Sequence, residues 1–119
     1  EIDLTGQICS ESIGSRMYSG TGGATDFAYG ALHSKGGRGI IAISSTAKKG
    51  TMTKIKPQLT PGAVVTISRN LADTIITEYG VAYMKGRTIP ERAKALIQIA
   101  HPDFRDELTF EARKLGLIQ

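Results

Sequence analysis

The sequence predicts an α/β domain, and three observations lead to that fold class. Short runs of β-branched and apolar residues occupy residues 39–82 and are typical of strands. Residues 88–116 instead show the apolar spacing of two helices. Between a first strand at residues 1–5 and these runs, a glycine-rich segment precedes a third helical pattern. At 119 residues the chain has the length of one domain, and we expect residues 1–119 to form one.

The strands are predicted from their apolar patterns. Residues 1–13 alternate partially, which is typical of a half-buried strand. The run at residues 39–43 is almost continuously apolar, as in a strand of an α/β fold that is covered on both faces. We expect further buried strands at residues 63–67 and 74–77, the second of which ends at Glu78.

The helices are predicted from caps and spacing. A helix that starts near Gly23 or Ala24 should end at the Gly36-Gly37 pair. Thr88 and Glu91 are spaced as a capping box, and the helix behind them should end before Pro102. A last helix then begins at Pro102 and is closed by Gly116. The apolar faces predicted for these last two helices are Ala93, Leu96, Ile97 and Ala100, then Phe104, Leu108, Ala112 and Leu115.

Composition and charge narrow the function classes. No apolar run approaches the roughly 20 residues of a membrane-spanning helix, so we expect no membrane partner. The net charge of +4 is mild and tryptophan is absent, which favours a small phosphorylated ligand over nucleic acid. The single cysteine, Cys9, excludes a disulfide within the chain, and its distance in sequence from His33 and His101 argues against a zinc site. These features predict no bound metal and a reducing compartment, either the cytoplasm or an organelle matrix, and we expect the cytoplasm.

The segment Tyr18–Phe27, with the letters YSGTGGATDF, carries the clearest pattern for a ligand site. Glycines at 20, 22 and 23 permit positive φ and a close approach of a ligand to the backbone. Free N–H groups in such a loop, together with the start of a helix, can bind a phosphate or a developing oxyanion. A plain glycine turn before a helix, with Asp26 in its first turn, explains the pattern about equally well. The segment matches neither GxxxxGK[ST] nor GxGxxG.

Two further groups of residues are candidates for a site. Glu78 ends a predicted strand, which is where α/β folds place ligands, although it could simply cap the loop toward Gly80. Lysines at 48, 49, 54 and 56 create a local positive field that suits phosphate groups. For any single lysine a solvated loop position is the simpler interpretation.

The chain resembles the C-terminal part of the acetyl-CoA hydrolase/CoA-transferase family, which includes 4-hydroxybutyrate CoA-transferases. Each matching stretch is a weak motif, but together they cover essentially the whole chain in the expected order. The stretches are EIDLTGQ at 1–7, GTGGATDF within 18–27, STAK at 45–48, Pro57, GAVVT at 62–66, SRN at 68–70, TEYGVA at 77–82 and HPDFR at 101–105.

This resemblance implies a three-layer α/β/α CoA-transferase-like domain, of which residues 1–119 would be the C-terminal portion with helices at its C-terminal end. It also implies a longer two-domain enzyme that transfers CoA between an acyl-CoA and a short-chain carboxylate, or that hydrolyses acyl-CoA. The family uses a glutamate nucleophile. That glutamate would lie upstream of the present residues, so we expect the chain alone to be inactive. CoA and acyl-CoA would be substrates, no cofactor would be tightly bound, the partner would be the upstream domain, and a homodimer is possible.

The resemblance also assigns roles to individual residues. The Gly23 N–H would help to bind the thioester oxygen, with Gly22 shaping the turn, and Glu78 would orient the nucleophile or the acyl chain. Lys48, in the family's S-x-A-K pattern, is the lysine expected to bind CoA phosphates. The residues expected to contact CoA are Gly20, Gly22, Gly23, Ala24, Asp26, Phe27 and Lys48.

Two other functions remain open at this point. One is a CoA- or nucleotide-binding module without catalysis, which would bind CoA on its own. The other is a basic nucleic-acid-binding domain, which would show a salt-sensitive affinity for DNA. The scarcity of aromatic residues and the acidic residues of the C-terminal helices argue against the second.

Overall fold

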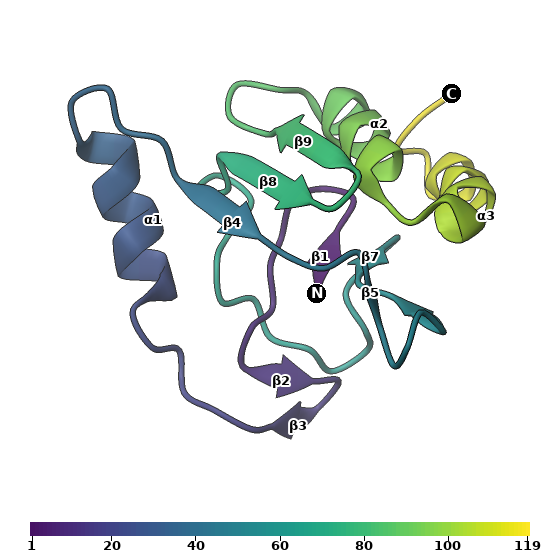
Figure 1. Ribbon diagram of the computed structural model, residues 1–119, viewed down its shortest axis with the longest axis horizontal. Helices are drawn as coiled ribbons and strands as arrows, with labels where there is room; N and C mark the ends of the chain where they lie inside the picture. Colours follow the sequence, from purple (N-terminus) through teal and green to yellow (C-terminus); the bar gives the residue numbers. More distant parts are fainter.

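The computed structural model describes all residues 1–119 and confirms the α/β class, with two of its three helices at the C-terminal end (Figure 1). The helices are α1 (Ala24–His33), α2 (Ile89–Ile99) and α3 (Pro102–Lys114). The strands are short, and they are β1 (Ile2–Asp3), β2 (Ser12–Ile13), β3 (Arg16–Met17), β4 (Ile40–Ala42), β5 (Thr46–Ala47), β6 (Met52–Thr53), β7 (Ile55–Lys56), β8 (Thr74–Thr77) and β9 (Gly80–Tyr83).

The largest sheet has three strands in the order β4-β8-β9. β4 runs parallel to β8, with Ile41 opposite Ile75, and β9 returns antiparallel to β8, with Ala82 opposite Ile75. β1 pairs with β7 in parallel, and the pairs β2-β3 and β5-β6 form two antiparallel hairpins. The carboxyl ends of β4 and β8 therefore lie side by side, as parallel neighbours must.

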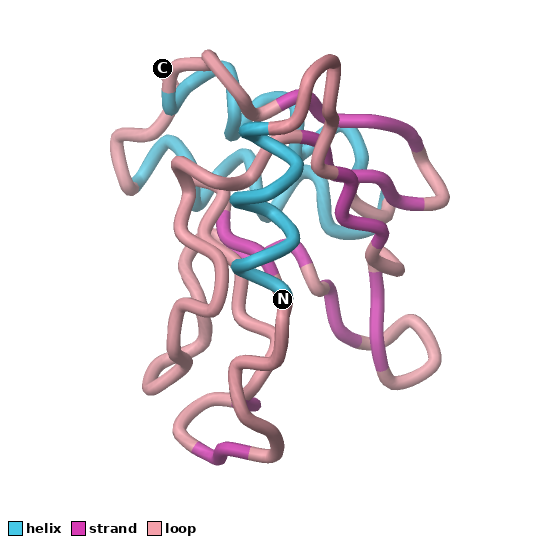
Figure 2. Tube along the Cα trace, turned by 90° about the vertical axis from the view of Figure 1, so that its left-hand side faces the viewer, coloured by secondary structure: helices cyan, strands magenta, loops and turns pink.

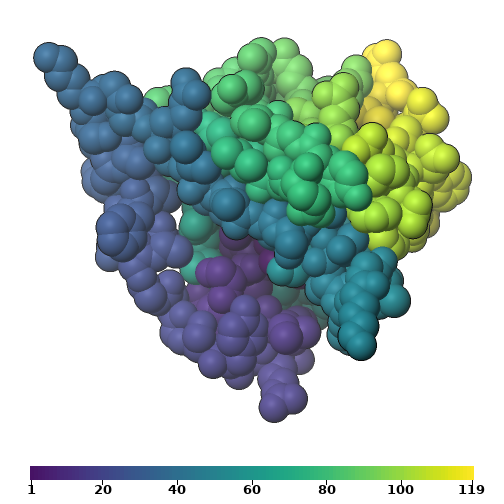
Figure 3. Space-filling view, in the orientation of Figure 1, coloured from purple at the N-terminus to yellow at the C-terminus, as the bar shows by residue number.

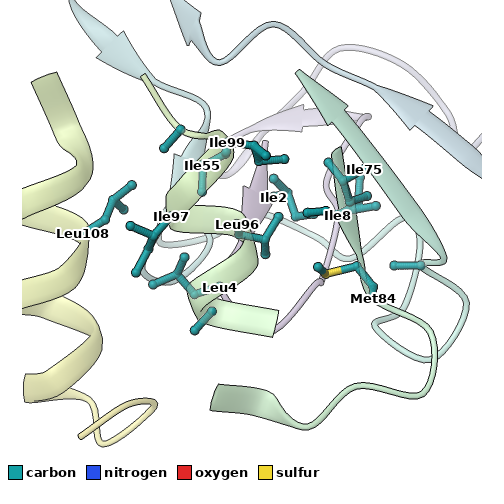
Figure 4. Packing of buried hydrophobic residues seen from close by; sticks show 14 of the residues in the cluster. Ile2, Leu4, Ile8, Ile55, Ile75, Met84, Leu96, Ile97, Ile99 and Leu108 are labelled. Atoms are coloured by element: carbon teal, nitrogen blue, oxygen red, sulfur yellow. The ribbon is translucent and has the colours of Figure 1, made fainter. Parts of the chain in front are cut away.

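The hydrophobic core lies between one face of this sheet, α2 and the strand β1 (Figure 4). Ile75 from β8, Leu96 from α2 and Ile2 from β1 are each no more than 1% exposed. Full burial of an aliphatic side chain stabilises a fold by roughly 1.5–3 kcal/mol. This core therefore fixes the sheet, and with it the loops that follow β4 and β8.

The two C-terminal helices have the predicted starts and ends. The Glu91 N–H donates to the Thr88 hydroxyl while the Thr88 N–H donates to the Glu91 carboxylate, so the capping box is complete. The predicted apolar face of α2 is buried at all four positions. α3 starts at Pro102, and Gly116 follows its end at φ +71°. Leu115, predicted on the inner face of α3, is instead 38% exposed, because it caps the helix and no longer follows its inner face.

α1 starts at Ala24, as predicted, yet it has no buried residue. Figure 1 shows it at the opposite edge of the molecule from α2 and α3, and the turned view of Figure 2 looks at the molecule from the α1 side. The outer face of the β4-β8-β9 sheet is also open, and Ile40, Val81 and Tyr83 are each 47–57% exposed on it (Figure 3). The prediction that residues 39–43 are covered on both faces is therefore wrong within this chain, because only the Ile41 side of β4 packs against the core.

The predicted strand at residues 63–67 is also wrong. Only Ile67 pairs, in an isolated bridge with Ile8, while Val64 and Val65 are exposed by 37% and 46%. The segment follows Gly62, at φ +86°. The Val64 N–H donates to the Ser12 hydroxyl, and backbone bonds to another segment form only at Thr66 and Ile67, both with Ile8. No helix of the chain has the length and apolar character that crossing a membrane would require.

Candidate active-site elements

The glycine segment, residues 20–24, leads directly into α1. Gly22 has a φ of +57°, a conformation that side chains rarely adopt, and a Cβ built at Gly20 or Gly22 would meet nothing within 4 Å. Gly23 is the N-cap of α1, and no side chain caps the helix there. The N–H groups of Gly22, Gly23 and Ala24 donate to no acceptor within the chain. The segment thus presents unpaired donors at the positive end of a helix dipole, the geometry that binds negative charge.

Glu78 lies at the end of β8, next to the residues that follow β4. Its carboxylate accepts the Ser45 N–H at 3.0 Å and also accepts the Ser45 hydroxyl. The Ser45 hydroxyl is the largest influence that lowers the pKa of Glu78 below its ordinary value, and the Ser45 N–H acts in the same direction. Glu78 itself is exposed while Ser45 is fully buried, so a rigid residue holds an accessible carboxylate in its ionised form.

Lys48 lies at the tip of the β5-β6 hairpin. Lys48 and Lys49 both have positive φ, 50° and 55°, and the Lys48 carbonyl accepts the N–H and the hydroxyl of Thr51. Positive φ in two successive residues with side chains is uncommon and costs on the order of 1 kcal/mol at each. The hairpin therefore holds both side chains at an exposed tip.

The structure brings some predicted site residues together and keeps others apart. Ala24 and Phe27 line a largely apolar hollow of about 470 Å³ between α1 and β4. Gly20, Gly22 and Asp26 are exposed near this end of α1. In Figure 1 the start of α1 lies on one side of the molecule, whereas the β8-β9 turn and the β5-β6 hairpin lie on the other. No hydrogen bond or hollow within the chain joins the glycine segment to Glu78 or Lys48.

Comparison with known proteins identifies the family. The model of the acetyl-CoA hydrolase/transferase C-terminal domain matches residues 1–112. The chain belongs to this family. It is 57% identical over 114 residues to the 4-hydroxybutyrate coenzyme A transferase of Clostridium kluyveri, and 54% identical over 118 residues to the succinyl-CoA:cyclohexane-1-carboxylate CoA transferase of Geobacter metallireducens. These alignments cover 96% and 99% of the chain, but only 27% of either relative.

Solved structures of the family have the same fold. RipA from Yersinia pestis superposes on 99% of the chain with a TM-score of 0.91 at 49% identity, and the match covers 26% of RipA. A 4-hydroxybutyrate CoA-transferase from Porphyromonas gingivalis superposes on 97% of the chain with a TM-score of 0.75 at 43% identity, and the match covers 24% of that protein. The chain thus spans about a quarter of the length of its family relatives.

Sequence analysis missed the contacts that two residues make near Glu78, namely Ser45 and Lys54. Ser45, in the matching stretch STAK, received no role, although it follows β4 and Glu78 follows β8. Because parallel neighbours end at the same sheet edge, this proximity could have been predicted once both strands were assigned. Lys54 was treated with the other lysines, yet its ammonium group donates to the Ser44 hydroxyl at 3.1 Å, next to Ser45. Sequence spacing gives no indication of that contact.

Proposed function

We propose that the protein carrying this chain transfers CoA between an acyl-CoA and a short-chain carboxylate. Five relatives that are 50–57% identical to the chain are named as CoA-transferases, as are two at 33–36%, whereas a relative named acetyl-CoA hydrolase is 32% identical. The higher identity to named transferases favours transfer over hydrolysis. In this proposal the nucleophilic glutamate lies in the upstream part of the polypeptide, which also forms the partner domain, and the present chain alone is inactive.

The unpaired N–H groups of the glycine segment carry the proposal. When a carboxylate attacks the thioester carbon, the carbonyl oxygen gains negative charge and needs hydrogen-bond donors. The Gly23 N–H would be one such donor, and the positive end of α1 would add to it. Donors that are already oriented stabilise this charge without reorganising during the reaction. Gly22 would hold the turn that points the Gly23 N–H away from the helix.

Glu78 and Lys48 would support this reaction from the side of the molecule opposite the start of α1. A carboxylate with a lowered pKa stays ionised near neutral pH, so Glu78 would accept hydrogen bonds and orient the nucleophile or the acyl chain. Lys48 would pair with the phosphate groups of CoA as a point charge on an exposed hairpin. Gly20, Ala24, Asp26 and Phe27 would contact CoA or its acyl group beside the glycine segment.

Replacing Gly23 with proline in the full-length protein tests the proposal directly. Proline removes the N–H, and because its ring holds φ near −65°, the native φ of −97° must shift by about 30°. Gly23→Ala is the matched control, because it keeps the N–H and its Cβ would lie 3.3 Å from the Phe27 ring, a contact that a small shift relieves. We expect Gly23→Pro to lower kcat by about 10²–10³ relative to Gly23→Ala. Equal turnover in two folded variants would remove the Gly23 N–H from the mechanism.

A further inference from the structure

Thr66 holds the residue that follows the glycine segment directly, and it contacts Glu11, which holds the residues that precede the segment. The Thr25 hydroxyl, at the start of α1, donates to the Thr66 carbonyl oxygen across 41 residues of sequence. The Thr66 hydroxyl donates to the Glu11 carboxylate at 2.8 Å and accepts the Ser10 N–H at 3.0 Å. Thr66 and Glu11 are each 7% exposed, so these bonds are largely shielded from competing water.

Glu11 connects Thr66 to the other end of the segment. Its carbonyl oxygen accepts the N–H groups of Tyr18 and Ser19 at 3.0 and 3.3 Å. The Tyr18 hydroxyl in turn donates to the Ser10 carbonyl oxygen at 3.0 Å. The chain is therefore held at Tyr18 and Ser19 through Glu11, and held again at Thr25 directly.

Thr66 is itself fixed to the hydrophobic core. Its N–H donates to the Ile8 carbonyl oxygen at 2.8 Å, and Ile8 pairs with Ile67 in an isolated bridge. Ile8 and Ile67 are both members of the buried core cluster. None of the N–H groups from Gly20 to Ala24, which lie between the two held ends, has a partner in the chain, so their direction depends on where the two ends are held.

We propose that Thr66 is a positioning residue for the proposed CoA transfer, through which the core sets the geometry of the Gly23 N–H. This inference rests on the function proposed above. Thr66 acts through Thr25 and Glu11 and touches no reacting atom. A displacement of about 1 Å between reacting groups can lower a rate by about 100-fold, so loosening either end of the segment should affect the chemical step.

The experiment compares Thr66→Val and Thr25→Val with the wild type in the full-length enzyme. Valine keeps the shape of threonine and removes only the hydroxyl. We expect kcat to fall about 10-fold or more in each variant, while KM for acyl-CoA and the affinity for free CoA change less than twofold, because free CoA has no thioester oxygen. Thr25→Ser, which restores the hydroxyl, should recover kcat. Thr60→Val is the matched control, since the Thr60 hydroxyl also donates to a carboxylate, that of Glu1, at 2.8 Å.

Hydrogen–deuterium exchange supplies a readout independent of turnover. The N–H groups of Tyr18 and Ser19, which are bonded to Glu11, should exchange faster in Thr66→Val than in Thr60→Val. Thr66→Val keeps the carbonyl oxygen that holds Thr25, so the Phe27 N–H at the start of α1 should exchange faster in Thr25→Val. Unchanged exchange and unchanged kcat in both valine variants, with Gly23→Pro inactive, would overturn the role of Thr66 and leave the proposed function standing. Faster exchange together with a fully active Gly23→Pro would support the fastening by Thr66 and place the error in the proposed function.

Discussion

The two ends of this domain differ in how completely they are packed. At the C-terminal end, α2 buries five of its 11 residues and joins a core that includes Leu96 and Leu108. At the other end, α1 buries none of its 10 residues, Phe27 is 82% exposed, and the N–H groups at its start have no partners. The inner face of α2 is thus covered by other residues of the chain, whereas α1 and the glycine segment before it expose apolar side chains and hydrogen-bond donors.

This difference separates the part of the chain that stabilises the domain from the part that would meet a ligand or the upstream chain. Loops and helix ends that carry function are held by a rigid scaffold and contribute little to its core. The glycine segment and Glu78 fit this description, since each is exposed and each is held by a buried residue, Thr66 and Ser45 respectively. The comparison therefore predicts large stability effects at one end and effects on activity at the other.

The sharpest contrast should be between truncations of Leu96 and Phe27. Leu96 is fully buried, so Leu96→Ala should lower the free energy of unfolding by about 2–5 kcal/mol through lost burial and an unfilled cavity. Phe27→Ala should change it by less than about 0.5 kcal/mol, because the ring is already in solvent. Urea denaturation of the 119-residue chain measures both. A loss of several kcal/mol for Phe27→Ala would show that α1 is part of the stabilising core.

Arg92 allows the packed end to be tested through a polar group. Arg92 is 9% exposed, and its guanidinium donates to the carbonyl oxygens of Thr5, Arg69 and Arg87 at 3.2, 2.6 and 3.1 Å without forming a salt bridge. Burial lowers the pKa of Arg92, although the group remains charged. Removing the donors with Arg92→Met should lower the free energy of unfolding by about 2–3 kcal/mol, since three acceptors lose their partner.

Arg92→Lys is the control for charge alone. A single ammonium group cannot reproduce the planar fork that reaches the three loops, so this variant should recover less than half of the loss. The position of the Arg92 guanidinium also explains why residue 6 is a glycine. Gly6 has a φ of +99°, and a Cβ at this position would lie 3.0 Å from the Arg92 Nη1. Full recovery by lysine would mean that the charge, and not the geometry, matters here.

A smaller effect should follow from removing the cap of α2. The Thr88 hydroxyl accepts the Glu91 N–H, so Thr88→Ala should lower the free energy of unfolding by about 1 kcal/mol. Thr109→Val is the comparison, because the Thr109 hydroxyl donates only to a carbonyl oxygen of its own helix, that of Arg105. If the two variants are equally stable in urea, the capping box contributes nothing beyond an ordinary helix side chain.

The features that could be predicted from sequence are those set by neighbours along the chain. The capping box at Thr88, the stop before Pro102 and the start of α1 after Gly23 each depend on a few adjacent residues, and all three predictions are confirmed. Continuous apolar and β-branched runs likewise predicted β4 and β8. The same local reasoning failed at residues 63–67, where the backbone of a β-branched run pairs with another segment only at Thr66 and Ile67, both with Ile8, and therefore forms no strand.

The parts of the candidate site that escaped prediction depend on such distant contacts. Thr66 meets Glu11 and Thr25 across 55 and 41 residues, and Ser45 meets Glu78 across 33. Hydroxyl groups of serine and threonine are frequent and have many possible partners, so spacing alone cannot select the pair that forms. The glycine segment was found because its pattern is local, whereas the residues that hold it were not.

The smallest effect on stability, and a clear one on titration, is expected at Ser45. The Ser45 hydroxyl donates to Glu78 and favours its charged form, so Ser45→Ala should raise the pKa of Glu78 toward its ordinary value. A carboxylate whose pKa is lowered by folding stabilises the native state fully above its ordinary pKa and loses that contribution as pH falls through its lowered pKa. Because Glu78 is exposed, this contribution is small, and NMR titration of its carboxylate is the suitable measurement.

In the full-length enzyme, the acidic limb of the rate profile should shift to higher pH in Ser45→Ala, while Thr46→Ala should leave it in place. An unshifted Glu78 titration would show that Ser45 positions this carboxylate without tuning its charge.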